Sequence, residues 1–145
     1  MLSEKLNILL ADDDKDDCLL FEEAIKELSH FVHLSTVPDG EQLMQLLTQK
    51  TYTLPHVLFL DLNMPRKNGF ECLCEIKQNK KLKDLAVVMF STSFPRDKTY
   101  EQEMINVLLK IGAQNYIRKP NNFEQLKQAI LQVITAMTKK KFVYN

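Results

Sequence analysis

Apolar residues gather in five short runs along this chain, and amphipathic stretches separate the runs. Four runs are nearly all apolar and cover residues 8–11, 57–60, 87–90 and 116–117. Residues 31–37 form another run, which we interpret as the second strand in chain order. Runs of this length with few polar breaks are typical of parallel strands that are covered on both faces. The pattern therefore predicts a buried parallel sheet.

The segments between the runs place apolar residues three or four positions apart, as expected for helices with one buried face. Asp14 stands where a side-chain oxygen would cap the first helix, and Gly112 stands where the fourth helix would end. The expected inner stripes are Cys18, Phe21, Ile25 and Leu28 in the first helix, Met104, Ile105, Leu108 and Leu109 in the fourth, and Phe123, Leu126, Ile130, Val133 and Met137 in the fifth. Five strand–helix units predict a doubly wound α/β fold, a five-stranded parallel sheet of the flavodoxin-like order 2-1-3-4-5.

The bulk composition fits one domain and gives no global electrostatic sign of a partner. The chain has 145 residues, of which 45% are hydrophobic, and this is enough for a real core. Its formal net charge is zero, so no overall field attracts nucleic acid or an anionic membrane. No apolar run approaches the length of a membrane span or of a signal-peptide core. With only three cysteines, we expect reduced thiols and a cytoplasmic location.

Polar residues stand at the ends of the four nearly apolar runs. Asp12 and Asp13 follow the first run, Asp61 follows the second, Ser91 ends the third, and Lys119 comes two residues after the fourth. The carboxyl ends of parallel strands open on one edge of the sheet, where ligands bind. Each residue alone has an ordinary explanation, such as a helix cap or a surface lysine. Together they predict a site at this edge of the sheet.

These motifs, in this order, resemble those of the response regulator receiver domain, the phospho-acceptor module of two-component signalling. The resemblance extends over nearly the whole chain and rests on four segments: the aspartates at 12–14, residues 61–69 (DLNMPRKNG), residues 91–93 (STS) and residues 116–120 (YIRKP). The loop after Asp61 is also loosely similar to single-domain regulators associated with phytochrome-type and other hybrid kinases.

The resemblance implies a phosphoryl transfer from a phosphohistidine to Asp61, which would become an aspartyl phosphate. It also implies Mg²⁺, held directly by Asp13, by Asp61 and by the backbone carbonyl of Asn63, with Asp12 acting mostly through water. Lys119 would supply positive charge to the phosphoryl group. The protein would catalyse only its own phosphorylation and dephosphorylation.

A conformational switch is implied as well. In receivers, the phosphoryl group draws the hydroxyl of the fourth strand inward, and an aromatic residue of the fifth strand turns into the vacated space. Ser91 and Tyr116 match these two positions, and Thr92 would match only after a shift of one residue, which points to the other face. The Lys119–Pro120 bond is expected to be cis, as it typically is in this family.

Few residues follow the last expected helix, so we expect residues 1–145 to form one receiver domain without an output domain. Its core would span about 6–138, with a frayed basic tail at 139–145. The expected partners are a sensor histidine kinase, a hybrid kinase or a phosphotransfer protein, and a downstream protein that reads the surface of the fourth and fifth helices and the fifth strand. Nucleic acid binding and membrane insertion are not expected. Residues 94–106 belong to a connection that is longer than usual in this family.

Three other classes stay open at this point. A haloacid-dehalogenase-type phosphatase also uses a Mg²⁺-bound aspartate after a strand, but it needs a second aspartate where this chain has Asn63. A flavodoxin-like FMN binder would need hydroxyl and amide groups after the first strand, where three aspartates would repel a phosphate. An inactive receiver would keep the fold and only bind partners. Turnover of a phosphate ester, yellow colour and inertness to acetyl phosphate, respectively, would identify these classes.

Overall fold

Five parallel strands form the centre of the molecule, and the computed structural model describes residues 5–28, 31–92 and 98–143. The strand order is β2-β1-β3-β4-β5, which confirms the predicted topology. Their bounds are β1 Leu6–Ala11, β2 Val32–Val37, β3 Val57–Leu60, β4 Ala86–Ser91 and β5 Asn115–Arg118. β1, β3 and β4 are almost entirely buried, as their apolar sequences require, whereas the edge strand β2 is not.

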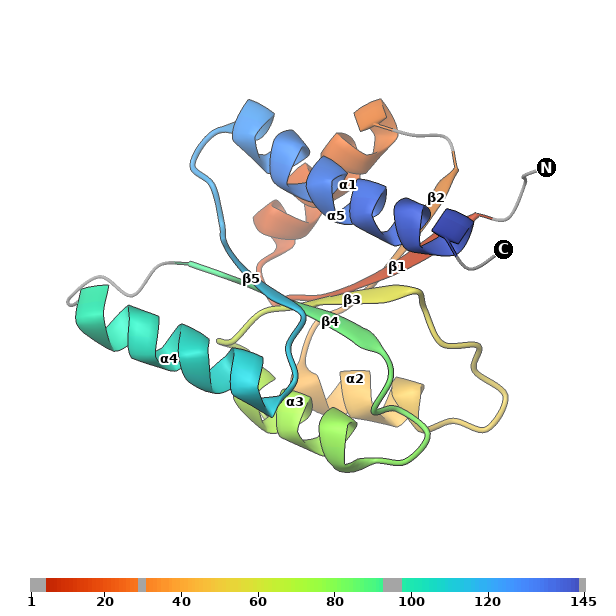
Figure 1. Cartoon of the computed structure of the whole chain (residues 1–145), viewed down its shortest axis with the longest axis vertical. Coiled ribbons are helices and arrows are strands. Elements are labelled where there is room, and N and C mark those ends of the chain that lie inside the picture. Colours follow the sequence, from red (N-terminus) through yellow and green to blue (C-terminus); the bar gives the residue numbers. More distant parts are fainter. Residues whose placement is uncertain (1–4, 29–30, 93–97, 144–145) are drawn as a thin grey trace.

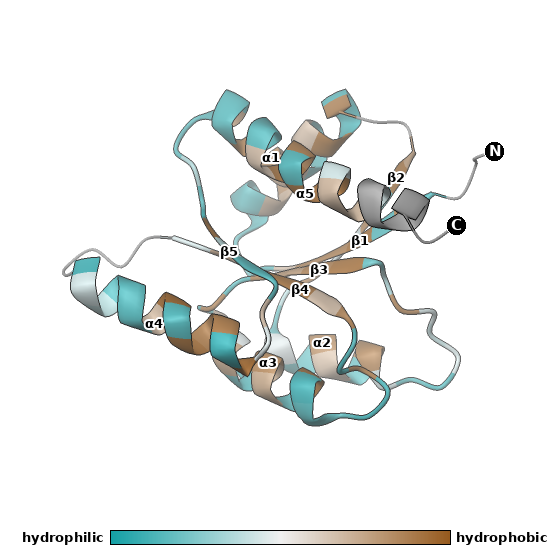
Figure 2. Cartoon of the chain, in the orientation of Figure 1, coloured by the Kyte–Doolittle hydropathy of each residue, from teal (hydrophilic) through white to brown (hydrophobic). Residues whose placement is uncertain are grey.

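Helices cover both faces of this sheet (Figure 1). α1 and α5 lie together on one face, and α2, α3 and α4 lie on the other. The bounds are α1 Lys15–Leu28, α2 Gly40–Leu47, α3 Gly69–Gln78, α4 Lys98–Ile111 and α5 Phe123–Val143. Buried apolar residues of the helices pack with those of the strands in one cluster on each face, and Figure 2 shows the hydrophobic (brown) colouring of the central strands such as β3. The fold is therefore the doubly wound α/β arrangement that the sequence predicted.

The core has two halves because successive strand residues point to opposite faces. Under α1 and α5, the rings of Phe21, Phe59 and Phe90 meet edge to face, with centroids 4.9 to 5.8 Å apart. Such edge-on contacts are favoured by the charge distribution of aromatic rings. Leu60 and Met89 belong to the other half, beneath α2, α3 and α4. β3 and β4 are therefore packed on both faces, and this packing fixes the positions of their ends.

Local signals start the helices that border the carboxyl edge of the sheet. The side chain of Asp14 accepts a hydrogen bond from the backbone of Asp17 at 3.1 Å, as expected for an N-cap. α3 starts with a reciprocal capping box between Asn68 and Glu71. Gly69, which follows Asn68, packs closely against the loop after β3. A Cβ at this position would lie 2.1 Å from the carbonyl oxygen of Asp61. A side chain at this position would displace the loop that follows β3.

Two details of the helices differ from the sequence prediction. Leu109 was expected in the inner stripe of α4 but is 42% exposed, and the acidic Glu101 is buried instead. The reason is an ion pair between Glu101 and Arg118 of β5, which a hydropathy pattern does not reveal. α5 also continues to Val143, into the segment 139–145 that the sequence predicted as a tail, of which residues 144–145 lie outside the described residues.

None of the helices in the part of the chain that the structure describes is both long and apolar enough to cross a membrane.

Candidate functional site

The carboxyl edge of the sheet brings together the polar residues that end the central strands. β1 and β3 are in register, so Asp12 and Asp61 each come one residue after a paired position, and the backbone N–H of Asp61 donates to the carbonyl of Ala11 at 3.0 Å. Ser91 is the last residue of β4, and the backbone N–H of Lys119 donates to its carbonyl at 2.7 Å. The predicted convergence of these side chains is therefore present in the fold.

The ammonium of Lys119 is the electrostatic centre of this site. Its Nζ lies 2.7 Å from Asp12 Oδ2, 2.9 Å from Asp17 Oδ2 and 3.3 Å from Asp61 Oδ2. It also lies 5.7 Å from the ring centroid of Phe90, within the range of a cation–π contact. Burial by itself lowers the pKa of Lys119, but the hydrogen bonds to Asp12 and Asp17 and the charge of Asp61 outweigh it and raise the pKa well above its usual range. The lysine therefore carries a permanent positive charge here.

The Asp61 carboxylate is almost buried, with 7% of its side chain exposed, and donors approach both of its oxygens. The hydroxyl of Ser91 donates to Oδ1 at 3.1 Å, and the backbone N–H of Asn63 donates to the same oxygen at 3.3 Å. Lys119 donates to Oδ2. These contacts hold the carboxylate in one orientation at the end of β3.

Asp12 and Asp13 differ sharply in their surroundings. Asp12 is buried, and burial raises its pKa from 3.8 to about 6, although the hydrogen bond from Lys119 opposes this effect. Asp13 is exposed. Carboxylate oxygens of Asp12, Asp13 and Asp61 all lie within 4.8 Å of one another, so these three residues could hold a metal ion. An all-carboxylate set of this kind suits a hard cation such as Mg²⁺ or Ca²⁺.

The two residues of the expected switch lie on the same face of the sheet. Met89 and Tyr116 are register partners in β4 and β5, as are Ser91 and Arg118 two residues later. Residues two apart in a strand share a face, so Ser91 and Tyr116 both face the layer that contains α4. The Tyr116 hydroxyl is buried and has no hydrogen-bond partner within the described part of the chain. Burial, followed by the nearby charge of Glu101, raises the pKa of Tyr116.

Two contacts beside the site were not expected from the sequence. The first is Asp17 on Lys119, which joins the first turn of α1 to the site. The second is the pair of Glu101 and Arg118, which joins α4 to the end of β5. The sequence did contain a sign of the Asp17 contact. Asp17 stands three residues after the N-cap Asp14, so its carboxylate lies in the first turn of a helix that follows the acidic end of a strand. Glu101 gave no comparable signal.

The expected cis bond before Pro120 is not present, because the described residues contain no cis peptide bond. Trans is the lower-energy form of an X–Pro bond, and Lys119 reaches its carboxylates with this bond in the trans form. The predicted geometry of this bond was therefore wrong.

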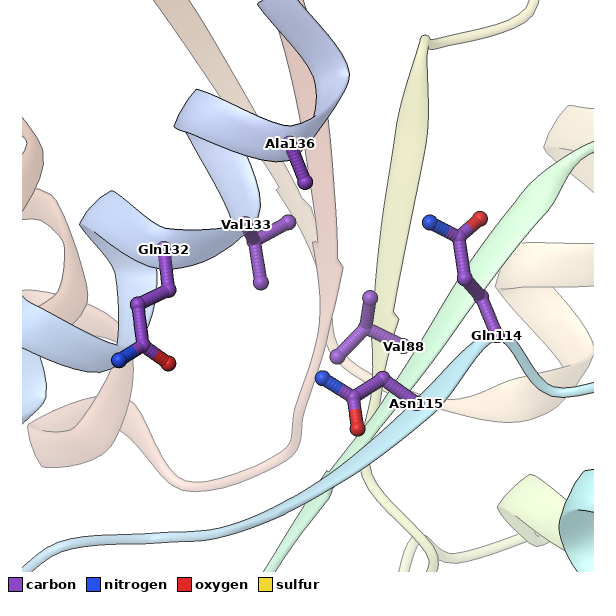
Figure 3. A pocket seen from close by; sticks show the side chains of 6 residues that line it. All are labelled: Val88, Gln114, Asn115, Gln132, Val133 and Ala136. Carbon is purple, nitrogen blue, oxygen red and sulfur yellow. The ribbon is translucent and has the colours of Figure 1, made fainter. Parts of the chain in front are cut away.

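A cavity of about 130 Å³ lies elsewhere, between α5 and the beginning of β4 and β5. Figure 3 shows its lining, which is made of amide and small apolar side chains: Val88, Gln114, Asn115, Gln132, Val133 and Ala136. Val88 and Asn115 pair three positions before Ser91 and Arg118, so about 10 Å of strand separates the cavity from the carboxyl edge. None of its lining residues is ionisable, and it does not belong to the acidic site.

Comparison with known proteins agrees with this geometry. The family model of the response regulator receiver domain matches residues 8–131. The chain belongs to this family. Among curated relatives, the probable chemotaxis protein CheY of Rhizobium etli is 28% identical over 136 residues, which cover 94% of this chain and 98% of that protein. The response regulator Rcp1 of Synechocystis is 34% identical over 123 residues, which cover 82% of this chain and 80% of that protein.

Solved structures of receivers superpose on most of this chain. The Mn²⁺-bound form of response regulator Rcp1 is 30% identical with a TM-score of 0.75, covering 88% of this chain and 90% of that chain. The phosphorylated cyanobacterial phytochrome response regulator RcpA is 32% identical with a TM-score of 0.74, covering 89% of this chain and 91% of that chain. These similarities favour a receiver of two-component signalling over the phosphatase and flavin-binding alternatives.

Proposed function

We propose that this receiver accepts a phosphoryl group on Asp61 from the phosphohistidine of a sensor histidine kinase, a hybrid kinase or a phosphotransfer protein. The observation that carries the proposal is the position of Lys119, whose ammonium donates to Asp61 at 3.3 Å although the two residues are 58 positions apart. A buried carboxylate held against a permanent cation is suited to receive a phosphoryl group, because the cation compensates the added negative charge.

The transfer would break the P–N bond of the phosphohistidine and form a bond between phosphorus and a carboxylate oxygen of Asp61. The histidine leaves with the electron pair of the P–N bond and takes up a proton. Asp61 supplies the attacking electron pair, Ser91 and the backbone of Asn63 fix the orientation of its carboxylate, and Lys119 faces the incoming negative charge. Hydrolysis of the acyl phosphate would restore Asp61 and end the signal, so the protein acts catalytically only on itself.

The acidic cluster fits the Mg²⁺ that receivers use. We assign direct contacts to Asp13, Asp61 and the backbone carbonyl of Asn63, and a water-mediated contact to Asp12. The mutual distances support this assignment, because carboxylate oxygens of Asp12, Asp13 and Asp61 all lie within 4.8 Å of one another. A bound Mg²⁺ would neutralise charge on the phosphoryl oxygens. The exposed Asp13 would give the ion access to water, which Mg²⁺ surrenders reluctantly.

The signal would leave the site through Ser91 and Tyr116. A phosphoryl group on Asp61 would offer the Ser91 hydroxyl a new acceptor in place of Asp61 Oδ1. Tyr116 lies on the same face, and its buried hydroxyl lacks a partner within the described residues, a state that costs about 1–3 kcal/mol. A rearrangement that gave this hydroxyl a partner would therefore be favourable. It would alter the packing of α4 on β5 and so the surface that a downstream protein reads.

The partner surface of this proposal includes α4, β5 and α5. Two apolar residues of α4, Val107 and Leu109, are 45% and 42% exposed, and Tyr100 is 51% exposed. Tyr100 and Val107 are seven residues apart and so lie on one side of α4, and exposed apolar side chains on one side of a helix are typical of protein contacts. A movement of α4 would change the position of these three residues together.

Acetyl phosphate provides a direct test. The protein is incubated with acetyl phosphate and Mg²⁺, and its intact mass is measured for the wild type, for Asp61→Asn and for Asp84→Asn, which changes an exposed aspartate before β4. We expect one added phosphoryl group in the wild type and in Asp84→Asn, and none in Asp61→Asn or in the presence of EDTA. A wild-type protein that stays unmodified would contradict the proposal and indicate an inactive receiver.

A further inference from the structure

We propose that Asp17 is a positioning residue for phosphoryl transfer, one that holds the Lys119 ammonium so that a hydrogen-bond donor points at Asp61. This inference rests on the proposed function, because it concerns the same lysine and the same acceptor. Its observation is separate: Asp17 Oδ2 lies 2.9 Å from Lys119 Nζ, closer than the 3.3 Å between Nζ and Asp61 Oδ2.

The geometry of an ammonium explains why this contact matters. A lysine ammonium has three N–H donors and no acceptor. At this site the three donors meet three carboxylates from three different elements: Asp12 after β1, Asp17 in α1 and Asp61 after β3. When two donors are fixed by Asp12 and Asp17, the third has only one direction left. That direction is the oxygen of Asp61, where a phosphoryl group would arrive.

Asp17 differs from the other two partners of Lys119 in one respect. Asp12 and Asp61 belong to the set of three carboxylates that could share a metal ion, and Asp17 does not. Metal binding and phosphorylation would therefore change the partners of Asp12 and Asp61, whereas Asp17 would keep its contact with the lysine. Asp17 is the constant anchor of Lys119 in every state of the site.

The backbone around Asp17 is suited to this role. Its N–H donates to the N-cap side chain of Asp14 at 3.1 Å, which fixes the first turn of α1. The side chain of Asp17 is 32% exposed, whereas that of Lys119 is 10% exposed. Loss of Asp17 would thus leave the lysine with a free donor at the solvent side of the site. The ammonium could then turn toward water and away from the direction of Asp61.

A double-mutant cycle tests this role through the rate of phosphorylation. The rate is measured with acetyl phosphate, which transfers its phosphoryl group to Asp61 and leaves as acetate, at saturating Mg²⁺. The variants are Asp17→Ala, Asp17→Asn, Lys119→Ala and the double variant Asp17→Ala with Lys119→Ala. Asp16→Ala is the matched control, since Asp16 is the neighbouring exposed aspartate of the same helix and forms no ion pair with Lys119.

We expect Asp17→Ala to slow phosphorylation about tenfold, because a hydrogen bond to a charged group is lost at a partly exposed position. Asp17→Asn keeps an acceptor oxygen and should lose less. In the Lys119→Ala background, Asp17→Ala should have no further effect, which a merely structural role of Asp17 would not produce. Mg²⁺ affinity should stay within about twofold of the wild type, because Asp17 is not among the three clustered carboxylates.

Two results would overturn the inference. One is a rate for Asp17→Ala equal to that of Asp16→Ala while the wild type is phosphorylated normally. The other is an equal loss with and without Lys119. If Asp17→Ala fails to fold, the rate of Asp17→Asn decides in the same way. A wild type that acetyl phosphate does not modify would overturn the proposed function of Asp61 first, and this inference with it.

Discussion

Replacing Lys119 by methionine should destabilise the protein in a strongly pH-dependent manner. Methionine keeps much of the length and apolar surface of the lysine stem but removes the charge. Asp12, Asp17 and Asp61 then lose their shared cation, and Asp13 lies close by as a further negative charge. The energetic cost should be largest at Asp12, because none of its side chain is exposed.

The raised pKa of Asp12 limits the size of this loss. In the variant, the unpaired carboxylate of Asp12 can be neutralised by taking up a proton. Starting from a pKa of about 6, this uptake costs roughly 1 kcal/mol at pH 7 and roughly 3 kcal/mol at pH 8. The part of the loss of unfolding free energy that comes from Asp12 should therefore be smallest at pH 6 and grow as the pH rises. The sign follows from linkage: removal of the lysine raises the folded-state pKa further above the unfolded value, so the folded variant is favoured at low pH.

Urea unfolding at pH 6, 7 and 8 in EDTA measures these differences. Lys127→Met is a suitable control, because Lys127 also contacts two carboxylates, those of Glu27 and Glu124, but near the surface. We expect it to cost less than Lys119→Met at pH 8 and to show little dependence on pH. Adding Asp12→Asn to Lys119→Met should recover stability at pH 8. A loss that is the same at pH 6 and pH 8, or no larger than that of the control, would refute the reasoning.

Asp13→Asn should abolish Mg²⁺-dependent phosphorylation by acetyl phosphate, and Asp12→Asn should reduce it less; equal rates in EDTA would contradict the metal assignment. Beryllofluoride, a phosphoryl mimic, should change the amide hydrogen exchange of α4 as well as that of the loop after Asp61. Unchanged exchange across α4 would refute the coupling. Gly69→Ala should lower the free energy of unfolding by about 1–3 kcal/mol in a urea titration, because its Cβ would lie 2.1 Å from the Asp61 carbonyl oxygen. An unchanged midpoint would show that the loop adapts freely.

The strands could be predicted from the sequence because their apolar runs are short, dense and bounded by polar residues. β1, β3 and β4 are buried on both faces, and each ends beside the residue at which its run ends. α4 was harder to predict. Its pattern placed Leu109 inside and gave no reason to bury Glu101, since the partner Arg118 lies in a different element. Hydropathy describes the preference of a residue for water but not its pairing.

The acidic site was partly predictable for a topological reason. Parallel strands open on a common edge, so residues at their ends meet whatever their separation along the chain. Asp17 did not follow from this rule, because it lies on a helix, and the rotation of α1 about its axis decides which carboxylate reaches Lys119. The trans bond before Pro120 was not predicted either, because the prediction of a cis bond rested on what is typical of the family, and the geometry of this chain differs.

The central claim is that Asp61 is the phosphoryl acceptor, and its most direct test locates the modified side chain. The protein is treated with acetyl phosphate and Mg²⁺, reduced with borohydride, which converts an aspartyl phosphate into homoserine, and digested for tandem mass spectrometry. We predict homoserine at position 61 and unmodified aspartates at 12, 13 and 17. Homoserine at any of these other positions, or its absence throughout, would contradict the claim.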